Sequence, residues 1–389
     1  SLLRRGYTFW DERRREEASS VVQTRVGGQR ATVVRGPEAA RFFYTEPHLE
    51  RSSALPQTFV RPLFGSGPVH TLDGEQHAVR KEMFDGVLTA EASRDVALGV
   101  AQRWDERSPT WSGEIDVFRE VAEVLYDTGA DWVGLPHDDR DTPRRTRDMI
   151  AMVAGFGTVG PAQLVARRAR RRTDAWVMQE VRDVRASSTH HGTRPIGAVA
   201  AHHDANGSRL GDHVAAVEVI NLVRPLVATS WLVSGMALAL DSFPEVRADV
   251  VSGHVTPQEL AQEVRRYHPF VPFLAARATH DLDWQDTRIP AGTLLVLDVW
   301  GTNHDPAVWS HPERFDPLRY RVTPVTPYNL VPQGGGFRAT GHRCPGEDMV
   351  LTVLMALAPR LAALPFEVRG PRPGLRRMPP VPRCRLALP

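Results

Sequence analysis

Apolar residues recur at three- and four-residue spacing through most of the chain between Asp73 and Leu240. The segments A-S-R-D-V-A-L-G-V-A-Q-R-W and D-V-F-R-E-V-A-E-V-L-Y are typical of this part, and their period predicts helices with one buried face. The stretch from about Gly211 to Leu240 belongs to this helical part and is mostly apolar. It predicts a single helix about 45 Å long, at about 1.5 Å per residue, which is long enough to cross a whole molecule.

Short β-like runs flank this helical part. Between Arg30 and about Val69 the run A-T-V-V stands next to G-P-E-A-A-R-F-F-Y, in which Pro37 suits a helix start, and we expect a small mixed sheet region there. Thr256 and Pro257 suit the cap and first position of a later helix. The strand-like run T-L-L-V-L-D-V-W follows, and the last helix is E-D-M-V-L-T-V-L-M-A-L-A-P-R-L. The pattern predicts a mainly α protein.

The composition is typical of one globular domain. The chain has 389 residues, of which 42% are hydrophobic and 24% charged, and it shows no internal repeat and no Gly/Ser linker. We therefore expect residues 1–389 to form a single domain. The net charge is only +2, although one positive run contains Arg167, Arg168, Arg170, Arg171 and Arg172. We interpret this run as a solvated helix face and expect no binding to nucleic acid.

The sequence predicts neither a signal peptide nor a membrane span. The chain starts S-L-L-R-R-G-Y, and its longest nearly apolar stretch, Leu226 to Leu240, has about 15 residues where a span needs roughly 20. We therefore expect a cytoplasmic protein. The two cysteines, Cys344 and Cys384, are too few for a disulfide framework.

Cys344 lies in a glycine-rich segment that reads Q-G-G-G-F-R-A-T-G-H-R-C-P-G-E from Gln333 to Glu347. Backbone N–H groups and the start of the following helix favour a thiolate there, and glycines let the backbone approach a flat cofactor closely. Two other interpretations are a buried structural cysteine and a phosphate loop formed by the three consecutive glycines. The phosphate loop lacks the Lys-Ser/Thr pair that a nucleotide loop requires.

The segment G-H-R-C-P-G-E resembles the haem-binding loop of the cytochrome P450 family. Glu263 and Arg266 in E-V-R-R-Y-H-P resemble the family's Glu-x-x-Arg motif, and H-P-E-R-F-D-P-L-R-Y, from His311 to Tyr320, resembles its proline-rich meander. The resemblance covers essentially the whole chain. It implies a helical prism with a small β-rich region, in which haem b lies between the long central helix and the cysteine-loop helix. Cys344 is then the axial iron ligand, and Glu263 and Arg266 form a structural pair.

Three basic residues occupy positions from which this family contacts the haem propionates. They are His342, two residues before the cysteine ligand, and His77 and Lys81, four residues apart in H-A-V-R-K. Without the resemblance each would be interpreted as part of a solvated basic face. One departure is that Thr340 stands where the family usually has glycine, with Gly341 one position later, so we expect the loop to differ locally.

Arg224 and Pro225 stand where typical members of the family carry an acid-alcohol pair that delivers protons to bound oxygen, and Thr229 comes a turn too late. A buried arginine without an anionic partner is costly, and its guanidinium binds a carboxylate in a bidentate fork. A substrate carboxylate held by Arg224 could therefore take a proton from hydrogen peroxide and return it to the leaving oxygen. The alternatives are an internal salt bridge for Arg224 and a simple helix kink at Pro225.

The Arg-Pro pair resembles the hallmark of the family's fatty-acid peroxygenase branch, and F-G-T-V-G-P, E-V-R-R-Y-H-P-F, G-T-N-H-D-P and P-Q-G-G-G agree with that branch. The resemblance implies a long-chain fatty acid as substrate, hydrogen peroxide as co-substrate and no obligatory redox partner. The implied products are α- or β-hydroxy acids, or terminal alkenes made by oxidative decarboxylation.

The same resemblance gives candidate residues around the substrate. His70 matches the position that is glutamine in typical hydroxylating members and histidine in the known alkene-forming one, and Phe64 matches a residue that orients it by packing. The other candidates for an apolar pocket are Leu63, Phe156, Val159, Phe270 and Phe273. Plain core packing is an equal explanation for each of these.

Three other functions remain open at this point. The chain could be a reductase-dependent monooxygenase that acts on another small molecule, with the arginine run as a docking face. It could be a non-catalytic haem protein that binds or senses a ligand through Arg224. It could also be a haem-free binding module.

Overall fold

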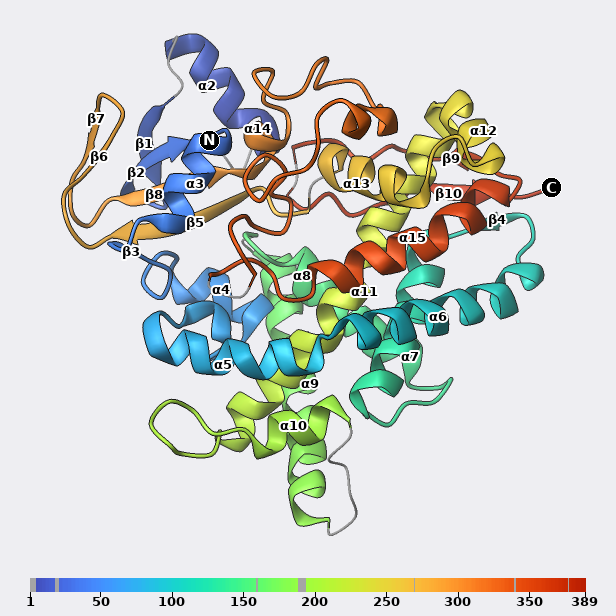
Figure 1. Cartoon of the computed structure of the whole chain (residues 1–389). Helices are drawn as coiled ribbons and strands as arrows, with labels where there is room; N and C mark the ends of the chain where they lie inside the picture. Colours follow the sequence, from blue (N-terminus) through green and yellow to red (C-terminus); the bar gives the residue numbers. More distant parts are fainter. Residues whose placement is uncertain are drawn as a thin grey trace.

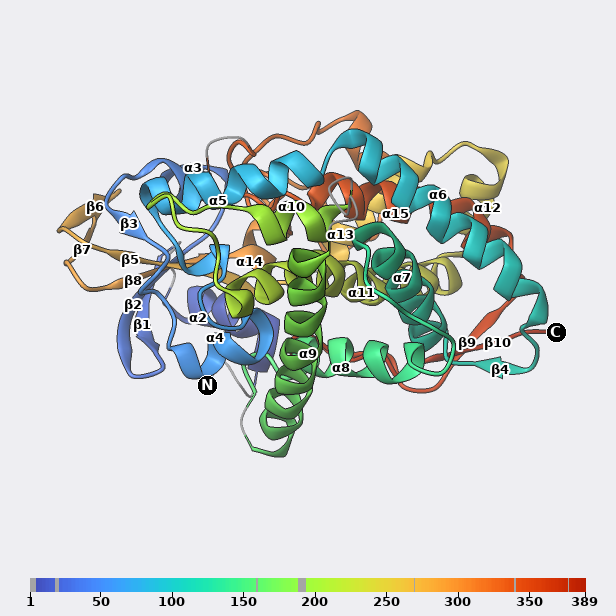
Figure 2. The same ribbon diagram turned by 90° about the horizontal axis from the view of Figure 1, so that it is seen from below.

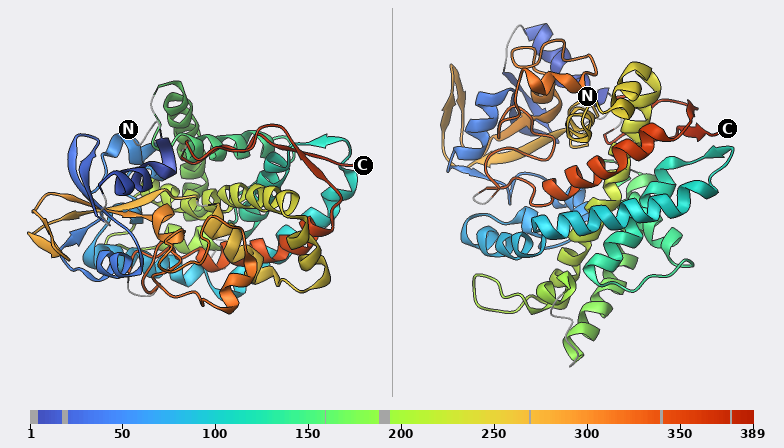
Figure 3. Two further views of the ribbon diagram at one scale, coloured as in Figure 1. Left: turned by 90° about the horizontal axis from the view of Figure 1, so that it is seen from above. Right: turned by 45° about the vertical axis from the view of Figure 1, so that its right-hand side comes forward.

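The computed structural model describes residues 5–17, 21–158, 160–187, 194–268, 270–338, 341–376 and 378–389. Helices dominate the fold, and most strands gather at one end of the molecule, as Figure 1 and both views of Figure 3 show. The predicted mainly α protein with a small β-rich region is therefore confirmed.

The helices follow the predicted periodicity, with apolar side chains directed to the core. The α-helices are α2 (Phe9–Glu17), α3 (Pro37–Thr45), α4 (Gln57–Phe64), α5 (Gly74–Val87), α6 (Ala90–Arg107), α7 (Val117–Val133), α8 (Thr142–Ala154), α9 (Pro161–Ala186), α10 (Pro195–Ala201), α11 (Asp212–Ser242), α12 (Pro244–Ser252), α13 (Pro257–Tyr267), α14 (Val299–Asn303) and α15 (Glu347–Ala363). Short 3-10 helices are η1 (Gly6–Thr8), η2 (Val69–Thr71), η3 (Ser108–Thr110) and η5 (Pro317–Arg321).

The strands form one main sheet and two smaller ones. They are β1 (Val22–Val26), β2 (Gln29–Val34), β3 (Leu49–Glu50), β4 (Glu114–Ile115), β5 (Phe273–Ala278), β6 (Leu282–Trp284), β7 (Thr287–Ile289), β8 (Leu294–Asp298), β9 (Glu367–Arg369) and β10 (Arg385–Ala387). The main sheet has the order β1-β2-β8-β5-β3, in which β2 and β8 run parallel with Val33 opposite Val296, and the other neighbours run antiparallel. The smaller sheets have the orders β4-β10-β9 and β6-β7.

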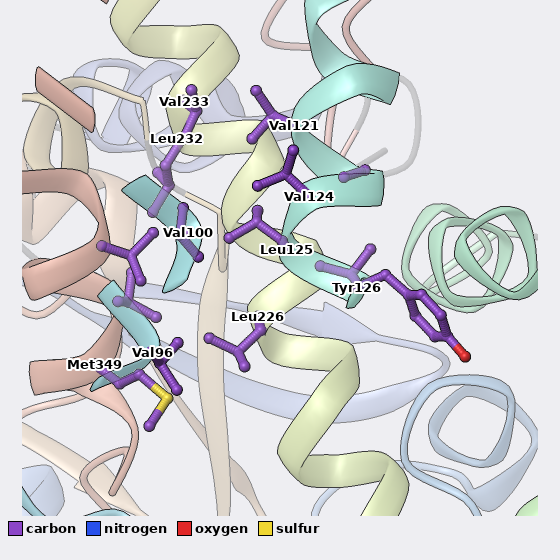
Figure 4. Packing of buried hydrophobic residues seen from close by; sticks show 14 of the residues in the cluster. Val96, Val100, Val121, Val124, Leu125, Tyr126, Leu226, Leu232, Val233 and Met349 are labelled. Atoms are coloured by element: carbon purple, nitrogen blue, oxygen red, sulfur yellow. The ribbon is translucent and has the colours of Figure 1, made fainter. Parts of the chain in front are cut away.

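The predicted central helix is α11, one helix from Asp212 to Ser242. It packs against α7, α9 and α15, and Figure 4 shows its Leu226 and Val233 among side chains of α6, α7 and α15. A helix that is apolar on all sides is buried, either in a protein core or in a membrane. Among the described helices α11 alone is long and apolar enough to cross a membrane, but 94% of its apolar window is buried inside the protein. It is therefore the core helix of the fold.

Local signals set the helix starts that position the site. Thr256 accepts the backbone N–H of Glu259 at 3.2 Å, and the Glu259 carboxylate accepts the N–H of Thr256 at 2.8 Å, so α13 begins with a complete capping box. α3 begins at Pro37, as predicted. α15 begins at Glu347, directly after the cysteine loop.

Glu263 on α13 ties this helix to the loop that precedes the cysteine. Its fully buried carboxylate accepts two N–H groups of Arg266, both at 2.8 Å. It also accepts hydrogen bonds from Arg319 at 3.2 Å, from the Tyr320 hydroxyl at 3.1 Å and from the Asp316 N–H at 2.8 Å. Arg266 in turn donates to backbone carbonyls in and after α14. The Glu-x-x-Arg pair is the centre of a buried network that fixes the meander segment.

The arginine run on α9 differs from its interpretation as one solvated face. Four of its members are exposed, but Arg170 is buried and donates to the Leu63 carbonyl at 3.2 Å. The interpretation was wrong at this position because Arg170 shares the buried face of the helix with Ala166, Thr173 and Val177. A run of like charges hides such a position, since helical periodicity turns one residue in three or four toward the core.

Candidate haem-thiolate site

The cysteine loop is held by its own hydrogen bonds. The Cys344 N–H donates to the Gln333 carbonyl at 3.1 Å, and the Glu347 N–H donates to the Cys344 carbonyl at 3.4 Å as α15 begins. Arg265 on α13 donates to the Gln333 side chain at 3.0 Å and to the Glu347 carboxylate. The loop is thereby fixed to the same helix that carries the Glu263 network.

The glycines before Cys344 allow the backbone to turn and Tyr44 to pack closely against it. Gly334 and Gly336 have left-handed backbones, with φ of 99° and 76°. A Cβ atom on Gly334 would lie 2.6 Å from the Tyr44 hydroxyl, and one on Gly336 would lie 3.3 Å from the Tyr44 Cβ. Both the backbone conformation and the close tyrosine therefore require glycine here.

The Cys344 sulfur lies inside the protein but keeps some accessible surface. Burial raises the pKa of this thiol, and a hydrogen bond from the Gly346 N–H opposes the rise. A buried thiolate therefore needs a cation, and a metal ion bound to sulfur deprotonates a thiol outright. Within the described ranges no group of three His, Cys, Asp or Glu side chains is placed to hold a metal ion. A metal at Cys344 must then bring its other ligands with it, as a haem iron does.

Basic groups gather beside the cysteine loop. His77 and Lys81 lie one turn apart on α5, and the His77 ring lies 3.9 Å from the His342 ring, centroid to centroid. Lys81 donates to the Gly341 carbonyl. Burial, followed by repulsion from His342 and Lys81, lowers the pKa of His77 to about 4, and burial also lowers the pKa values of His342 and Lys81. Carboxylates bound between these groups would relieve the repulsion.

Arg51 and Asp73 belong to the same group, although the sequence did not point to them. The Arg51 guanidinium packs on the rings of Phe43 and Tyr44, at 4.0 and 5.1 Å from their centres, and burial lowers its pKa. The Asp73 carboxylate accepts the backbone N–H of Arg51 at 3.0 Å and lies 3.4 Å from His342 Nε2. Basic side chains outnumber this carboxylate in the group, a balance that suits the two propionates of a haem.

His70 lies close to these groups. It lies in η2 and keeps accessible surface, but burial, followed by repulsion from Arg224, lowers the pKa of its ring to about 3. Phe64 packs on the His70 ring with centroids 4.3 Å apart, and the Arg224 guanidinium lies 5.2 Å from the Phe64 ring centre.

Arg224 on α11 is buried, with 4% of its surface exposed. It donates to the Leu63 carbonyl and, at 2.8 Å, to Asn221 Oδ1. Burial, followed by repulsion from Arg170, lowers the pKa of Arg224 to about 9, while the charges of Glu218 and then Cys344 raise it, so the guanidinium is protonated at neutral pH. Within the described part of the chain no carboxylate forms an ion pair with it. The internal salt bridge that the sequence left open is therefore not present there.

A buried chain of hydrogen bonds holds Arg224 in place. Asn221 accepts from Arg224 and donates to the Glu218 carboxylate at 2.9 Å. Glu218 is fully buried, accepts the Val69 N–H of η2 at 2.8 Å and pairs with Arg80 at 2.7 Å. Sequence reasoning missed Asn221 and Glu218, although two polar residues three apart in an apolar helix are a usable signal. One carboxylate thus positions both the arginine and the η2 turn.

Apolar side chains extend from Leu63 and Phe64 toward α7 and α8. We call this group the apolar cluster. Its members are Leu63, Phe64, Phe118, Ile150, Val153, Ala154, Phe156, Ala228, Trp231, Phe270 and Val381. It brings together most of the predicted pocket residues. Phe273 is not brought to it, because the alternation along β5 turns this side chain toward Trp10 and Val296 in the sheet. Val159 and Thr340 lie outside the described residues.

One kind of cofactor satisfies these groups together: a flat ring with two carboxylates and a metal that takes its remaining ligand from sulfur. The site is therefore that of a haem-thiolate protein.

Comparisons with known proteins agree with this class. The cytochrome P450 family model matches residues 258–357. The structure of a variant of cytochrome P450SP alpha (CYP152B1) is 34% identical, with 99% of this chain and 97% of that chain covered and a TM-score of 0.95. Cytochrome P450EX alpha (CYP152N1) with myristic acid is 36% identical, with 99% and 95% covered and a TM-score of 0.93.

Two further relatives extend the comparison. Ligand-free cytochrome P450 OleT is 32% identical, with 97% of this chain and 93% of that chain covered and a TM-score of 0.94. Cytochrome P450 BJ-4 of Bradyrhizobium diazoefficiens is 24% identical over 84% of this chain and 77% of its own length. The chain belongs to the cytochrome P450 family, and within it to the fatty-acid peroxygenase branch that the CYP152 proteins represent.

Proposed function

We propose that this protein oxidises long-chain fatty acids with hydrogen peroxide and binds the substrate carboxylate at Arg224. The observation that carries the proposal is the buried guanidinium, which in the described part of the chain has neutral acceptors and no carboxylate beside it. A fatty acid supplies the missing anion in a bidentate fork. The structure of P450EX alpha, a member of the same branch, contains myristic acid.

One set of residues is expected to bind the cofactor and another to bind the substrate. Haem bound to Cys344 supplies an iron centre at which the O–O bond of hydrogen peroxide is cleaved. His77, Lys81 and His342 hold its propionates, with Arg51 beside them.

The substrate carboxylate on Arg224 supplies the acid-base group. It accepts a proton from one oxygen of the peroxide and returns it to the other oxygen, which leaves as water. The neighbouring residues of α11 do not take this role. Pro225 has no N–H, and the Thr229 hydroxyl donates to the Pro225 carbonyl at 3.2 Å. Arg224 keeps the carboxylate ionised between turnovers, because a nearby positive charge favours the anion.

Two products balance with one equivalent of hydrogen peroxide. Oxygen insertion into a C–H bond next to the carboxylate gives a hydroxy acid and one water. Loss of a β-hydrogen together with the carboxyl group gives a terminal alkene, carbon dioxide and two waters. Phe64 packs on His70 and lies beside the Arg224 guanidinium, so an acid bound at Arg224 would bring its α and β carbons near His70.

Replacing His70 by Gln is expected to shift the products from alkene toward hydroxy acid by about threefold or more, the effect of changing one hydrogen bond. Burial and Arg224 hold the pKa of His70 at about 3, so the ring is neutral at assay pH, and the wild-type product ratio is expected to stay constant between about pH 6 and 8. Product analysis by gas chromatography measures both. Phe64→Leu is the matched control, because it removes the ring that packs on His70 and keeps the His70 imidazole. An unchanged ratio in His70→Gln would remove the assigned role.

The proposed function is tested with purified haem-loaded protein, myristic acid and hydrogen peroxide, without any reductase. Hydroxy acids or the one-carbon-shorter terminal alkene are the expected products. Products that form with a reductase and oxygen, but not with peroxide, would establish the monooxygenase alternative instead. Independence from a redox partner and a cytoplasmic location stay predictions.

A further inference from the structure

A cavity lies against the apolar cluster at Phe118, Ile150 and Val381. Its volume is about 370 Å³, and it is lined by the first turns of α7 and α8 and by the segment that enters β10. Figure 2 shows α8 beside the C-terminal strands β9 and β10, and the left view of Figure 3 shows the C-terminal segment passing along the same helix. The proposed function makes no use of this cavity.

Three cations at the rim of the cavity are not neutralised by the protein. Arg147, Arg383 and Arg385 line it with exposed side chains, and in the part of the chain that the structure describes none of them has an ion pair. The other charges at the rim are paired. Arg119 lies 3.5 Å from Asp116, and Glu123 lies 3.0 Å from Arg107. The cavity therefore attracts an anion.

Thr146 provides an independent sign of a polar ligand. It lines the same cavity, its surface is only 2% exposed, and its hydroxyl has no hydrogen-bond partner among the described residues. Buried hydroxyls are normally bonded, often to the carbonyl four residues earlier in a helix. Rotation of the Thr146 side chain would bring its hydroxyl to the cavity surface, where an oxygen atom of a bound anion would satisfy it.

The floor of the cavity is apolar and is formed by members of the apolar cluster. Phe118, Ile150 and Val381 line the cavity and also belong to the apolar cluster. Phe118 meets Trp231 of α11 edge to face, with centroids 4.6 Å apart and planes at 84°. Phe118 and Trp231 therefore connect the cavity to the apolar cluster, whose Phe64 lies beside the Arg224 guanidinium.

We propose that this cavity is a second binding site for a long-chain carboxylate. Arg147, Arg383 and Arg385 bind the carboxylate, the Thr146 hydroxyl donates to it, and the apolar floor holds the adjoining methylene groups. A free phosphate would satisfy the arginines but would leave that floor without a partner. The site receives fatty acid on its way to Arg224, and the Phe118 and Trp231 rings form the gate between the two compartments. The identity of the ligand rests on the proposed function.

The stoichiometry of myristate binding to the haem-loaded protein tests the proposal. The wild type is expected to bind two molecules by equilibrium dialysis. The triple variant Arg147→Gln, Arg383→Gln, Arg385→Gln is expected to bind one, Arg224→Met one, and the combined variant none. Thr146→Val is expected to weaken the outer site alone. A triple variant that still binds two molecules would overturn the proposal.

Steady-state kinetics gives a second measurement. The triple variant is expected to lower kcat/KM for myristic acid by about fivefold or more at low ionic strength, with kcat unchanged, because it removes the charge that collects substrate. The matched control replaces the exposed arginines Arg94, Arg167 and Arg209 by Gln, which removes the same charge elsewhere. An equal fall in kcat/KM in the control would show that only the overall charge matters, and it would contradict the proposed site.

Two outcomes separate the site from the proposed function. Wild-type protein that forms no product with peroxide, but loses one bound myristate in the triple variant, would remove the function and leave the site. Inorganic phosphate that displaces myristate as tightly as myristate itself binds would overturn the assignment of an amphiphilic ligand.

Discussion

Arg224→Met is expected to lower kcat/KM for myristic acid by about 100- to 10,000-fold, measured with peroxide as the only oxidant. Removing one partner of a buried ion pair costs about 3–5 kcal/mol, and each 1.36 kcal/mol is about tenfold in rate. The carboxylate also loses its position as acid-base group, so kcat is expected to fall along with the affinity. Retention of wild-type activity would show that another group binds the acid.

The same substitution is expected to have the opposite effect on stability. Met fills much of the volume of Arg without a charge, and in the described part of the chain the guanidinium has only neutral acceptors. The free energy of unfolding of the substrate-free protein is therefore expected to stay equal or to rise, by up to about 4 kcal/mol. Thermal unfolding measures this. Arg224→Lys is the control, because it keeps a charge and loses the bidentate fork.

Glu263→Gln is expected to lower the free energy of unfolding by about 3–5 kcal/mol and to reduce haem incorporation. The neutral amide would leave Arg266 and Arg319 without their shared carboxylate, and its NH2 group would face groups that can only donate. Because the same network fixes the segment before the cysteine loop, thermal unfolding and the Soret absorbance per protein are expected to fall together.

Glu259→Gln on the same helix is the matched control. Its carboxylate caps α13 and pairs with Arg321 at 2.7 Å near the surface. Loss of this charge is expected to cost about 1 kcal/mol and to leave the haem content unchanged. An equal fall in the free energy of unfolding in the two variants would show that the buried Glu263 network stabilises the fold no more than a surface carboxylate does.

Elements whose signals are local could be predicted from the sequence. The long helix α11 was predicted because the stretch that forms it is mostly apolar, and the start of α13 because Thr256 and Pro257 suit the cap and first position of a helix. The cysteine loop and the Glu263-Arg266 pair were recognisable for the same reason, since their residues are close together in the chain.

Residues whose role depends on distant partners could not be predicted in this way. Glu218 acts through Val69 and Arg80, which are more than 130 residues away. Arg51 lies in the loop before α4 and joins the basic group of His77, Lys81 and His342 only through the fold. No local sequence pattern predicts this position. Phe273 looked like a pocket residue by position, but strand alternation directs it to the sheet. In each case the deciding contact is tertiary.

The buried Arg224 guanidinium, which forms no ion pair among the described residues, also determines which molecules are expected to be poor substrates. A methyl ester, a primary alcohol or an alkane of equal length would fit the apolar cluster equally well but would leave the guanidinium unneutralised. Sites that must pair a buried polar group discriminate by about 10⁴–10⁵ against analogues that lack the partner, far more than a hydrophobic pocket achieves against one methylene. If Arg224 binds the substrate as proposed, the protein is expected to select its substrates by the ionised end of the chain and to oxidise esters, alcohols and alkanes of equal length far more slowly.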